Sequence, residues 1–503
     1  MNIHVSSNPL ESYKAEALVI IFTNKETFGR TIDEPLQSHL DFFRKAVDDK
    51  STNAEWFCTL EKTSSAKTPH LLLYSDSFLP EMPGAERLKS AAARCVEICR
   101  QYSLSHLVFA VMGCNPVEQG IALMEGIFLG DFLDQRYKSA PQKRPDLQIE
   151  FVTTHEHQNA LNAAVARHKP VLAGVNTARE LVNDPNNHLT PAQFVLYAQE
   201  LVSRQANLSL RVLNHNELLA KGYNLIHAVG CGSAEKPALM VLQLEAAEPH
   251  SAKEGAVSSV FLVGKGVCFD SGGYSIKDGK SMHTMNGDMA GAAAVFGSML
   301  AFAKLQPRVN ITAIIPLAVN AISSNAVLPG SIIAAKNGKT VYIENADAEG
   351  RLLLADAFCH VLEEGFKPGD VLVDIATLTG AAGVALGERL GALFTDDKGL
   401  AGLLHEAGSA TGDNIWPLPL WQEYAPSLKH PLADLCNMSS QSPAGGAIHA
   451  ANFLKEFVPE GARWAHLDIS KPARANSPTR YYKPGATGVG VRLIVNAVER
   501  LCE

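Results

Sequence analysis

Short apolar runs alternate with helical patterns throughout the first third of this 503-residue chain. Four runs bounded by polar residues predict strands at 17–23, 70–75, 106–113 and 147–153. Between two of them, residues 86–102 repeat apolar positions at helical spacing. This alternation is typical of an α/β domain. Because no candidate chemistry gathers here, we expect roles in assembly, substrate gating or regulation.

The apolar runs of the remaining chain are longer and more continuous. They predict strands that are buried on both faces, at 238–245, 258–267, 310–319, 371–378 and 464–470. Helical patterns such as 292–305 and 349–365 lie between them. The fold class is therefore α/β, with two domains that each have a central sheet flanked by helices. We expect the sheet of the C-terminal domain to be mainly parallel.

A helical pattern over about 158–184 separates the two regions and ends at Asp184-Pro185. Pro170 is expected to break or kink it. A new helix is predicted to begin at Thr190-Pro191, with threonine as the N-cap and proline in the first turn. The predicted domains are an N-terminal α/β domain at 1–165, a linker helix region at 166–190 and a catalytic domain at 191–503.

Composition narrows the class of protein. Apolar residues make up 46% of the chain and charged residues 19%, as in globular enzymes. The net charge of −8 argues against a broad nucleic-acid-binding face. Nine scattered cysteines without a CxxC pair favour a reducing compartment. The N-terminus lacks a signal-peptide pattern, and no run approaches the about 20 apolar residues that span a bilayer. We expect a cytoplasmic protein with neither membrane nor nucleic acid as a partner.

Two clusters of carboxylates about sixty residues apart carry the candidate chemistry. The first lies in VGKGVCFDSGGYSIK and in the following GDMAGAA, and the second lies in ENADAEGR. They place acidic residues at the ends of predicted strands or the starts of predicted helices, namely Asp270, Asp288, Asp347 and Glu349. Four carboxylates in one pocket cannot all stay ionised without cations. A pair of divalent metals would supply the charge, and such pairs usually serve hydrolysis.

Each element also has a simpler interpretation. Lys265 could be an ordinary ion-pair partner of Asp270, since a neutral lysine ligand costs about 4–5 kcal/mol at pH 7 from a reference pKa of about 10.4. Asp288 could cap a helix, and Arg351 could form a solvated ion pair. Their coincidence at strand ends favours the metal site, for which oxygen ligands and a lysine amine suit Mn²⁺ or Zn²⁺. A two-metal phosphoesterase remains an alternative, although such sites are usually richer in histidine.

With these residues in view, the chain resembles the leucyl aminopeptidase family, the dinuclear-metal M17 exopeptidases. The resemblance rests on VGKGVCFDSGGYSIK, GDMAGAAAV, NADAEGRLLLAD, DIATLTGAA, WAHLDIS and GATGVGVR. Within the family the chain looks closest to the bacterial peptidase B (aminopeptidase B) type. The resemblance covers the C-terminal two-thirds, whereas the first third matches only in α/β character.

The resemblance implies a dinuclear centre that holds Mn²⁺ or Zn²⁺ in each subunit. Lys265 and Asp288 would bind one metal and Asp347 the other. Asp270 and Glu349 would bridge the two ions.

The resemblance also implies how a peptide is bound and cleaved. Lys277 would polarise the scissile carbonyl, and Arg351 would hold a bicarbonate ion that acts as general base. Backbone groups of Thr377, Leu378 and Gly380 would bind the main chain of the substrate. Met285 would form part of the pocket for the N-terminal side chain of the substrate. The implied enzyme is a homohexamer that releases N-terminal residues from peptides. An alternative is a DNA-binding regulatory relative with weak or no peptidase activity.

Three positions depart from the family pattern. Asn286 stands where Lys or Arg is usual, which removes a positive charge near Asp288. Ala346 replaces a threonine whose hydroxyl could brace the loop. His449 stands where a small or hydroxyl residue is usual, and we expect a neutral histidine at the surface or behind the site. None of the three removes a proposed ligand, so an active enzyme is expected.

Overall fold

Two units, each built around its own sheet, make up the chain in the computed structural model. The structure describes residues 1–8, 14–22, 38–41, 45, 55–59, 70–75, 84–111, 115–246, 257–439 and 444–502. Unit 1 comprises Met1–Leu172 and Ser477–Pro484, and unit 2 comprises Ala173–Asn476 and Gly485–Glu503. The division falls within one helix, α4 (His155–Asn183), a few residues beyond the predicted end of the N-terminal domain.

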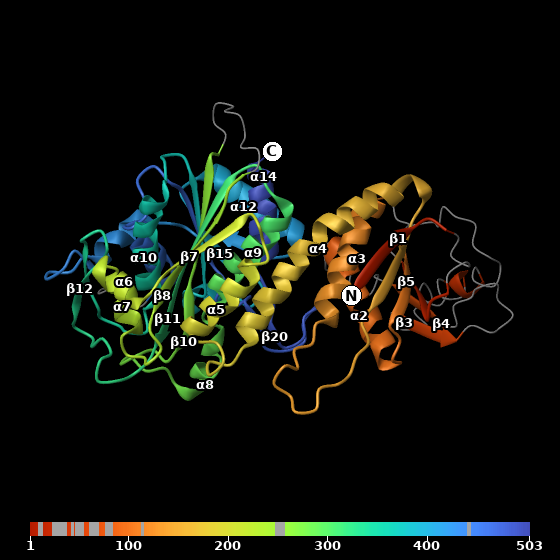
Figure 1. Ribbon diagram of the computed structural model, residues 1–503, viewed down its shortest axis with the longest axis horizontal. Helices are drawn as coiled ribbons and strands as arrows, with labels where there is room; N and C mark the ends of the chain where they lie inside the picture. Colours follow the sequence, from red (N-terminus) through yellow and green to blue (C-terminus); the bar gives the residue numbers. More distant parts are fainter. Residues whose placement is uncertain are drawn as a thin grey trace. The chain divides into compact units, whose positions relative to one another are not determined.

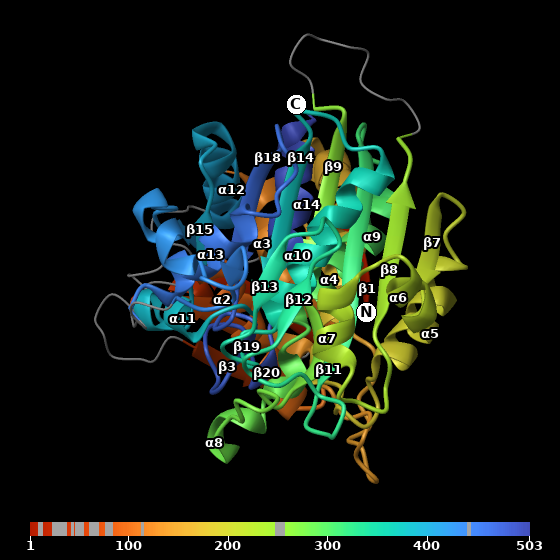
Figure 2. The same ribbon diagram turned by 90° about the vertical axis from the view of Figure 1, so that its left-hand side faces the viewer.

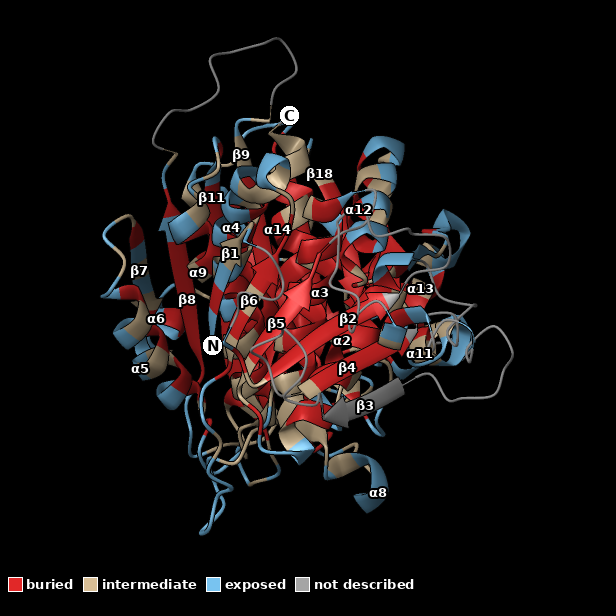
Figure 3. Cartoon of the chain, turned by 90° about the vertical axis from the view of Figure 1, so that its right-hand side faces the viewer, coloured by how far each residue is buried: buried red, intermediate tan, exposed pale blue. Residues whose placement is uncertain are grey.

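Unit 1 is an α/β layer structure, as the sequence predicts. Its six-stranded sheet has the order β1-β6-β5-β2-β4-β3, and only the β3–β4 pair is antiparallel. The strands are β1 (Asn2–Ser6), β2 (Ala17–Phe22), β3 (Glu55–Thr59), β4 (His70–Ser75), β5 (His106–Ala110) and β6 (Gln148–Val152). Helices α2 (Gly84–Gln101) and α3 (Pro116–Asp131) pack against each other, and α2 packs on β2 and β4. Strands β2, β4 and β5 are buried along most of their length (Figure 3).

A segment from near the C-terminus completes unit 1. Arg480 Nη1 and Tyr481 Oη both lie 3.1 Å from Glu86 Oε2 in α2. Lys89 Nζ lies 2.9 Å from Glu86 and 2.6 Å from Glu125, so the buried carboxylates are paired. These contacts explain why residues 477–484 belong to the N-terminal unit.

Unit 2 holds a nine-stranded sheet with the order β16-β15-β18-β14-β9-β11-β8-β7, and β10 pairs with β11 (Figure 2). The central pairs from β18 to β11 are parallel, whereas β15–β18, β11–β8 and β8–β7 are antiparallel. The strands of this sheet are β7 (Leu208–Leu213), β8 (Ala238–Leu244), β9 (Ser259–Gly264), β10 (Gly266–Asp270), β11 (Asn310–Asn320), β14 (Val371–Ala376), β15 (Gly391–Phe394), β16 (Ile415–Pro417) and β18 (Arg463–Asp468). The predicted central sheet is thus present, with antiparallel strands at its flanks.

Helices cover both faces of this sheet (Figure 1). One face carries α6 (His215–Ala220), α7 (Asn224–Gly230) and α10 (Gly350–Val361), and the other carries α9 (Ala290–Leu305), α12 (Lys398–Thr411) and α14 (Val491–Leu501). The remaining helices are α5 (Pro191–Val202), α8 (Gly279–Met282), α11 (Gly380–Leu386), α13 (Gly446–Lys455), η3 (Met285–Gly287), η4 (Leu362–Glu364) and η5 (Gln422–Leu428). Small ladders join β12 (Ile332–Ala334), β13 (Thr340–Tyr342) and β17 (Leu435–Cys436), and β19 (Arg474–Ala475) and β20 (Gly485–Ala486).

The strand predicted at 258–267 is interrupted at Lys265. β9 ends at Gly264 and β10 begins at Gly266. The Lys265 amide donates to the Ile375 carbonyl at 3.1 Å, and its carbonyl accepts from the Ala292 amide at 2.8 Å. The backbone of Lys265 is therefore held between β14 and α9, which fixes where its side chain starts.

The segment between the sheets differs from the prediction at two points. α4 begins at His155, three residues before the predicted start at about 158, and it continues through Pro170 without a break. The helix predicted at Thr190 is confirmed, because the Thr190 hydroxyl accepts from the Gln193 amide at 3.3 Å. Among the described residues, no helix combines the length and apolar character that crossing a membrane requires.

Candidate metal centre and active site

The acidic residues of both sequence clusters lie at one edge of the sheet of unit 2. Asp270 is the last residue of β10, and Asp288 lies just before α9. Asp347 and Glu349 lie in the turn that leads into α10. Thr377 directly follows β14. The carboxyl ends of parallel strands and the N-termini of helices usually hold ligands in α/β folds, and both features meet here.

Lys265 occupies the buried side of this cluster. Its Nζ lies 2.8–2.9 Å from the two Asp288 oxygens, 3.0 Å from Glu349 Oε1 and 2.9 Å from the Thr377 carbonyl. A Cβ on Gly350 would lie 2.5 Å from Lys265 Cε, so glycine there makes room for the lysine. The side chain is only 3% exposed. The ion pair with Asp270 considered from the sequence is replaced by pairs with Asp288 and Glu349.

Lys277 occupies the other side of the cluster. Its Nζ lies 2.8 Å from Asp270 Oδ2 and also contacts Asp347 Oδ1. Gly272 and Gly273 have φ of +84° and +58°, a region that favours glycine, and they turn the chain back after β10. The Lys277 amide then donates to the Ser271 carbonyl at 3.0 Å. The SGG sequence therefore forms a tight turn that returns Lys277 to the carboxylates.

The donor set fits divalent cations. Ligand atoms of Asp270, Asp347 and Glu349 all lie within 4.8 Å of one another. Glu349 is 3% exposed, and its Oε2 is buried without a hydrogen-bond partner among the described residues. Such an orphaned oxygen calls for a ligand. The two lysine ammonium groups also balance only half of the charge of four carboxylates.

The pKa values of three of the carboxylates are raised, because these groups are buried and their negative charge is not balanced. Burial, and then the nearby Asp270, raise the pKa of Glu349 to about 8. Burial raises the pKa of Asp288 to about 6, although Lys265 opposes the shift. The pKa of Asp347 is raised by burial and by Asp270. Positive charge from a metal ion would stabilise all three ionised forms.

The loop after β14 is tied both to the cluster and to a carboxylate that the sequence reasoning missed. The Thr377 hydroxyl donates to Asp288 Oδ1 at 2.8 Å. Asp468 accepts from the Leu378 and Thr379 amides at 3.1 and 3.0 Å. Asp468 ends β18, so the rule that located the other carboxylates at strand ends could have indicated it. Asp468 holds the loop that carries Thr377, Leu378 and Gly380.

Arg351 lies in the first turn of α10 and is buried, so the solvated ion pair considered from the sequence is not formed. Its Nη1 donates to the Asn437 carbonyl at 2.7 Å, and its Nε is buried without a partner among the described residues. Burial lowers the pKa of Arg351 to about 10, while Glu349 opposes this shift. The group remains a cation at neutral pH and can donate a further hydrogen bond to an anion.

The three departures from the family pattern have distinct surroundings. Ala346 is held through its backbone, since its amide donates to Ser275 Oγ at 3.0 Å and its carbonyl accepts from Asn320 Nδ2 at 3.1 Å. The loop is thus braced without a threonine hydroxyl. His449 is buried, with Nδ1 3.1 Å from Ser427 Oγ, so a surface position is wrong. Burial lowers its pKa and favours the expected neutral form. Asn286 donates to two backbone carbonyls.

Met285 completes the sequence-predicted set, and Asp288 lies close to it in the chain. Met285 is half-buried in η3, three residues before Asp288. The capping alternative for Asp288 is not realised, because Met289 is the N-cap of α9 and forms no side-chain cap.

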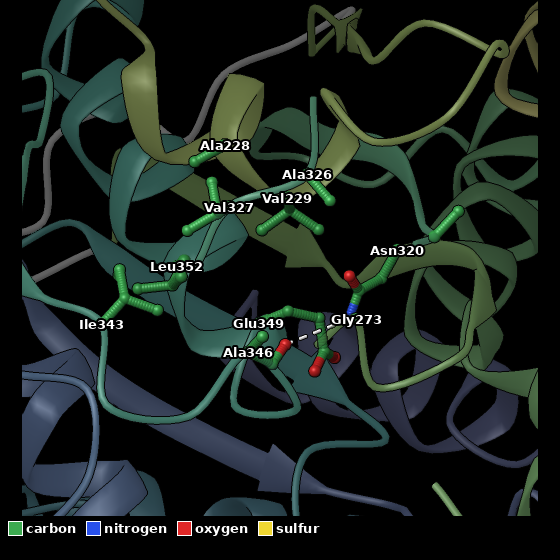
Figure 4. Close-up of a pocket in the computed structure, with 11 residues that line it drawn as sticks. Ala228, Val229, Gly273, Asn320, Ala326, Val327, Ile343, Ala346, Glu349 and Leu352 are labelled. Carbon is green, nitrogen blue, oxygen red and sulfur yellow. Dashed lines mark hydrogen bonds between the residues drawn. The ribbon is translucent and has the colours of Figure 1, made fainter. Parts of the chain in front are cut away.

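A hollow lined mainly by small apolar side chains lies beside Glu349 (Figure 4). Val229, Val327 and Leu352 form much of its wall. Ala346 also lines it, so the absence of a larger side chain at this position contributes to the space. Asn320, at its polar end, donates to Asp270 Oδ1 at 2.8 Å. The hollow therefore adjoins the carboxylate cluster but offers few polar groups of its own.

Comparisons with known proteins show which family this chain resembles. The model of the cytosol aminopeptidase family, catalytic domain, matches residues 176–495. A probable cytosol aminopeptidase from Geobacter sp. is 38% identical over 82% of each chain, and one from Syntrophotalea carbinolica is 36% identical over 99% of this chain and 100% of its own. The bottromycin maturation enzyme BotP in complex with Mn has a TM-score of 0.82 at 30% identity, covering 97% of this chain and 100% of its own. A tomato leucine aminopeptidase mutant has a TM-score of 0.83 at 27% identity, with coverage of 99% and 96%.

Proposed function

Because the chain belongs to the cytosol aminopeptidase family, we propose that it releases N-terminal residues from peptides by two-metal hydrolysis. The observation that carries this proposal is the convergence of Asp270, Asp347 and Glu349, whose ligand atoms lie within 4.8 Å of one another. The buried Oε2 of Glu349, unpaired among the described residues, supports it. The alternative phosphoesterase has no such support from the family.

Five side chains would hold the ions. Lys265 and Asp288 would bind one metal, Asp347 the other, and Asp270 and Glu349 both. The ligands suit Mn²⁺ or Zn²⁺, and the similar BotP structure was determined with Mn. Bound ions would supply Lewis acidity, which activates water and polarises the peptide carbonyl.

Lys277 would act as the electrophile toward the peptide carbonyl. Burial alone would lower its pKa, but Asp270 and Asp347 outweigh burial and raise it, so the amine remains an ammonium group at neutral pH. A preorganised ammonium group can donate to the oxygen on which negative charge develops. This role needs the charged form, in contrast to the role of Lys265 as a metal ligand.

Arg351 would hold a bicarbonate ion that receives the proton of the attacking water. Its cationic side chain is fixed by the Asn437 carbonyl, and its Nε is unpaired among the described residues. An anion bound there would complete the hydrogen bonding of a buried guanidinium group. The general base would thus be the bound bicarbonate ion, and the protein would only hold it in position.

Substrate would lie along the loop after β14. Asp468 already accepts from the Leu378 and Thr379 amides. The Leu378 carbonyl and the Gly380 amide are therefore the backbone groups we assign to the substrate main chain, with Thr377 beside Asp288. Half-buried Met285 would contact the N-terminal side chain. The proposal has four further parts: a leucyl-type preference, the peptidase B subtype, a homohexameric assembly and a cytosolic location.

The test is hydrolysis of a panel of aminoacyl p-nitroanilides and dipeptides after metal removal and after addition of Mn²⁺ or Zn²⁺. We expect metal-dependent turnover that is lost in Glu349→Gln and absent for N-acetylated substrates. Glu344→Gln, which lies outside the carboxylate cluster, serves as the matched control. Turnover of acetylated substrates, or full activity of Glu349→Gln, would contradict the proposal.

A further inference from the structure

A side chain from the segment that carries Asp288 binds two carbonyls at the C-terminal end of α4, one in its last turn and one just beyond it. Asn286 Nδ2 donates to the Val182 carbonyl at 3.1 Å and to the Asp184 carbonyl at 3.0 Å. The last four carbonyls of a helix have no partner within the helix. A primary amide has two N–H donors, and both are used here. Both N–H donors of the Asn286 amide therefore bind the end of α4.

The end of α4 is itself firmly held within unit 2. Arg179 Nε donates to the Ala486 carbonyl at 2.9 Å, and Asn183 Oδ1 accepts from the Ala486 amide at 2.9 Å. Arg179 is almost fully buried. The end of α4 is thus hydrogen-bonded to β20. The side chain of Asn286 connects the segment that carries Asp288 to this end of the helix.

Only Gly287 separates Asn286 from Asp288. The Asp288 amide donates to the Met285 carbonyl at 3.3 Å, which closes the single turn of η3. A Cβ on Gly287 would lie 3.6 Å from Val182 Cγ1, so this turn also packs against α4. Because only one residue intervenes, the anchored Asn286 restricts the backbone position of Asp288, whose carboxylate is also held by Lys265 and Thr377.

We propose that Asn286 is a positioning residue that fixes Asp288 for metal binding. The inference rests on the proposed function, since it assumes that Lys265 and Asp288 share an ion. Asn286 does this as a neutral amide, so it satisfies the helix carbonyls without placing a cation beside the centre. Groups that orient metal ligands typically contribute about 10–100-fold to metal affinity.

The test compares Mn²⁺ binding to the metal-stripped full-length protein by isothermal titration, for wild type, Asn286→Ala, Asn286→Lys and Asn207→Ala. Asn207 is also half-buried and donates to a helix-end carbonyl, that of Ala303 in α9, at 2.9 Å, so it is the matched control. Thermal unfolding of each variant checks the fold.

We expect Asn286→Ala to weaken one of two Mn²⁺ steps by about 10–100-fold and to leave the other unchanged. Its lost aminopeptidase activity should return at high Mn²⁺ concentration. A wild-type unfolding temperature of the metal-free variant would show that the loss does not come from a destabilised fold, which excess metal would also rescue. Asn286→Lys should restore binding only in part, because its ammonium group can donate to the same carbonyls but places a positive charge beside the centre. Asn207→Ala should bind like wild type.

Wild-type affinity at both steps in Asn286→Ala would overturn the inference. An equal loss in Asn207→Ala would also overturn it, because the effect would then be general. A wild-type protein that binds no Mn²⁺ and cleaves no peptide would instead refute the proposed function, so the two failures are distinguishable.

Discussion

Lys265 and Asp288 contact each other through both carboxylate oxygens, at 2.9 and 2.8 Å from Nζ. Burial alone would lower the pKa of Lys265, but Asp288 and Glu349 outweigh burial and raise it. The metal-free lysine is therefore an ammonium group. A lysine that binds a metal must be neutral, so metal binding has to expel this proton.

Mn²⁺ affinity should consequently increase with pH. Because the raised pKa keeps Lys265 protonated at neutral pH, each rise of one pH unit should strengthen binding by about tenfold for each released proton. Below pH 8, Glu349, whose pKa is raised to about 8, releases part of a second proton. Titration calorimetry in buffers of different ionisation enthalpy measures the released protons directly. Lys265→Met should release fewer protons. An affinity that stays constant between pH 6 and 8 would contradict the assignment of Lys265 as a ligand.

Lys277→Met should lower kcat by about 10²–10³-fold, the usual effect of removing one oxyanion-stabilising donor. Mn²⁺ affinity should not fall, because Lys277 pairs with Asp270 and Asp347 but is not a proposed ligand. Lys280→Met, an exposed position of α8, is the matched control and should behave like wild type. Steady-state kinetics at saturating Mn²⁺ measure the effect. If Lys277→Met lowers both the Mn²⁺ affinity and the activity, Lys277 contributes to metal binding and not to polarisation of the peptide carbonyl.

Arg351→Met should remove any stimulation by bicarbonate. In the wild type, Nε of the buried guanidinium has no partner among the described residues and can bind an anion, so added bicarbonate should increase kcat. Activity is measured in degassed buffer against bicarbonate concentration. Arg389→Met, at an exposed position, should keep the wild-type response. The same bicarbonate dependence in both variants would exclude Arg351 as the anion site.

The sequence located the carboxylates of the candidate site better than the segments around them. These carboxylates follow apolar strands or precede helices, so the pattern alone indicates their positions, whereas their roles as ligands are what the family resemblance implies. Asp468 follows the same rule, but it lies nearly 200 residues beyond Asp270 in the chain and outside the two acidic clusters. Asp468 reaches the loop after β14 because β18 pairs with β14, and this pairing is not apparent from the sequence.

Long-range contacts explain the other differences. Residues 477–484 join unit 1 through Arg480 and Tyr481, whose partner Glu86 is about 390 residues away. No local pattern encodes such a pair. His449 is polar in sequence but buried by its contact with Ser427.

Two glycines in different helices should respond oppositely to alanine. A Cβ on Gly291 in α9 would lie 2.1 Å from the Ile375 carbonyl oxygen of β14, and backbone cannot move aside easily. Gly291→Ala should therefore destabilise the protein by about 1–3 kcal/mol or more. Gly402 in α12 is exposed, and a Cβ added there would meet no atom within 4 Å, so Gly402→Ala should stabilise by about 0.5–1 kcal/mol. Urea unfolding of the metal-free variants measures both changes.

Gly291 also lies three residues after Asp288, so its substitution should affect the metal centre. Displacing the first turn of α9 would move Ala292, whose amide donates to the Lys265 carbonyl at 2.8 Å. We therefore expect Gly291→Ala to bind Mn²⁺ more weakly, whereas Gly402→Ala should bind it like wild type. If Gly291→Ala unfolds at a wild-type urea concentration and binds Mn²⁺ normally, the close packing of α9 on β14 does not fix the ligands.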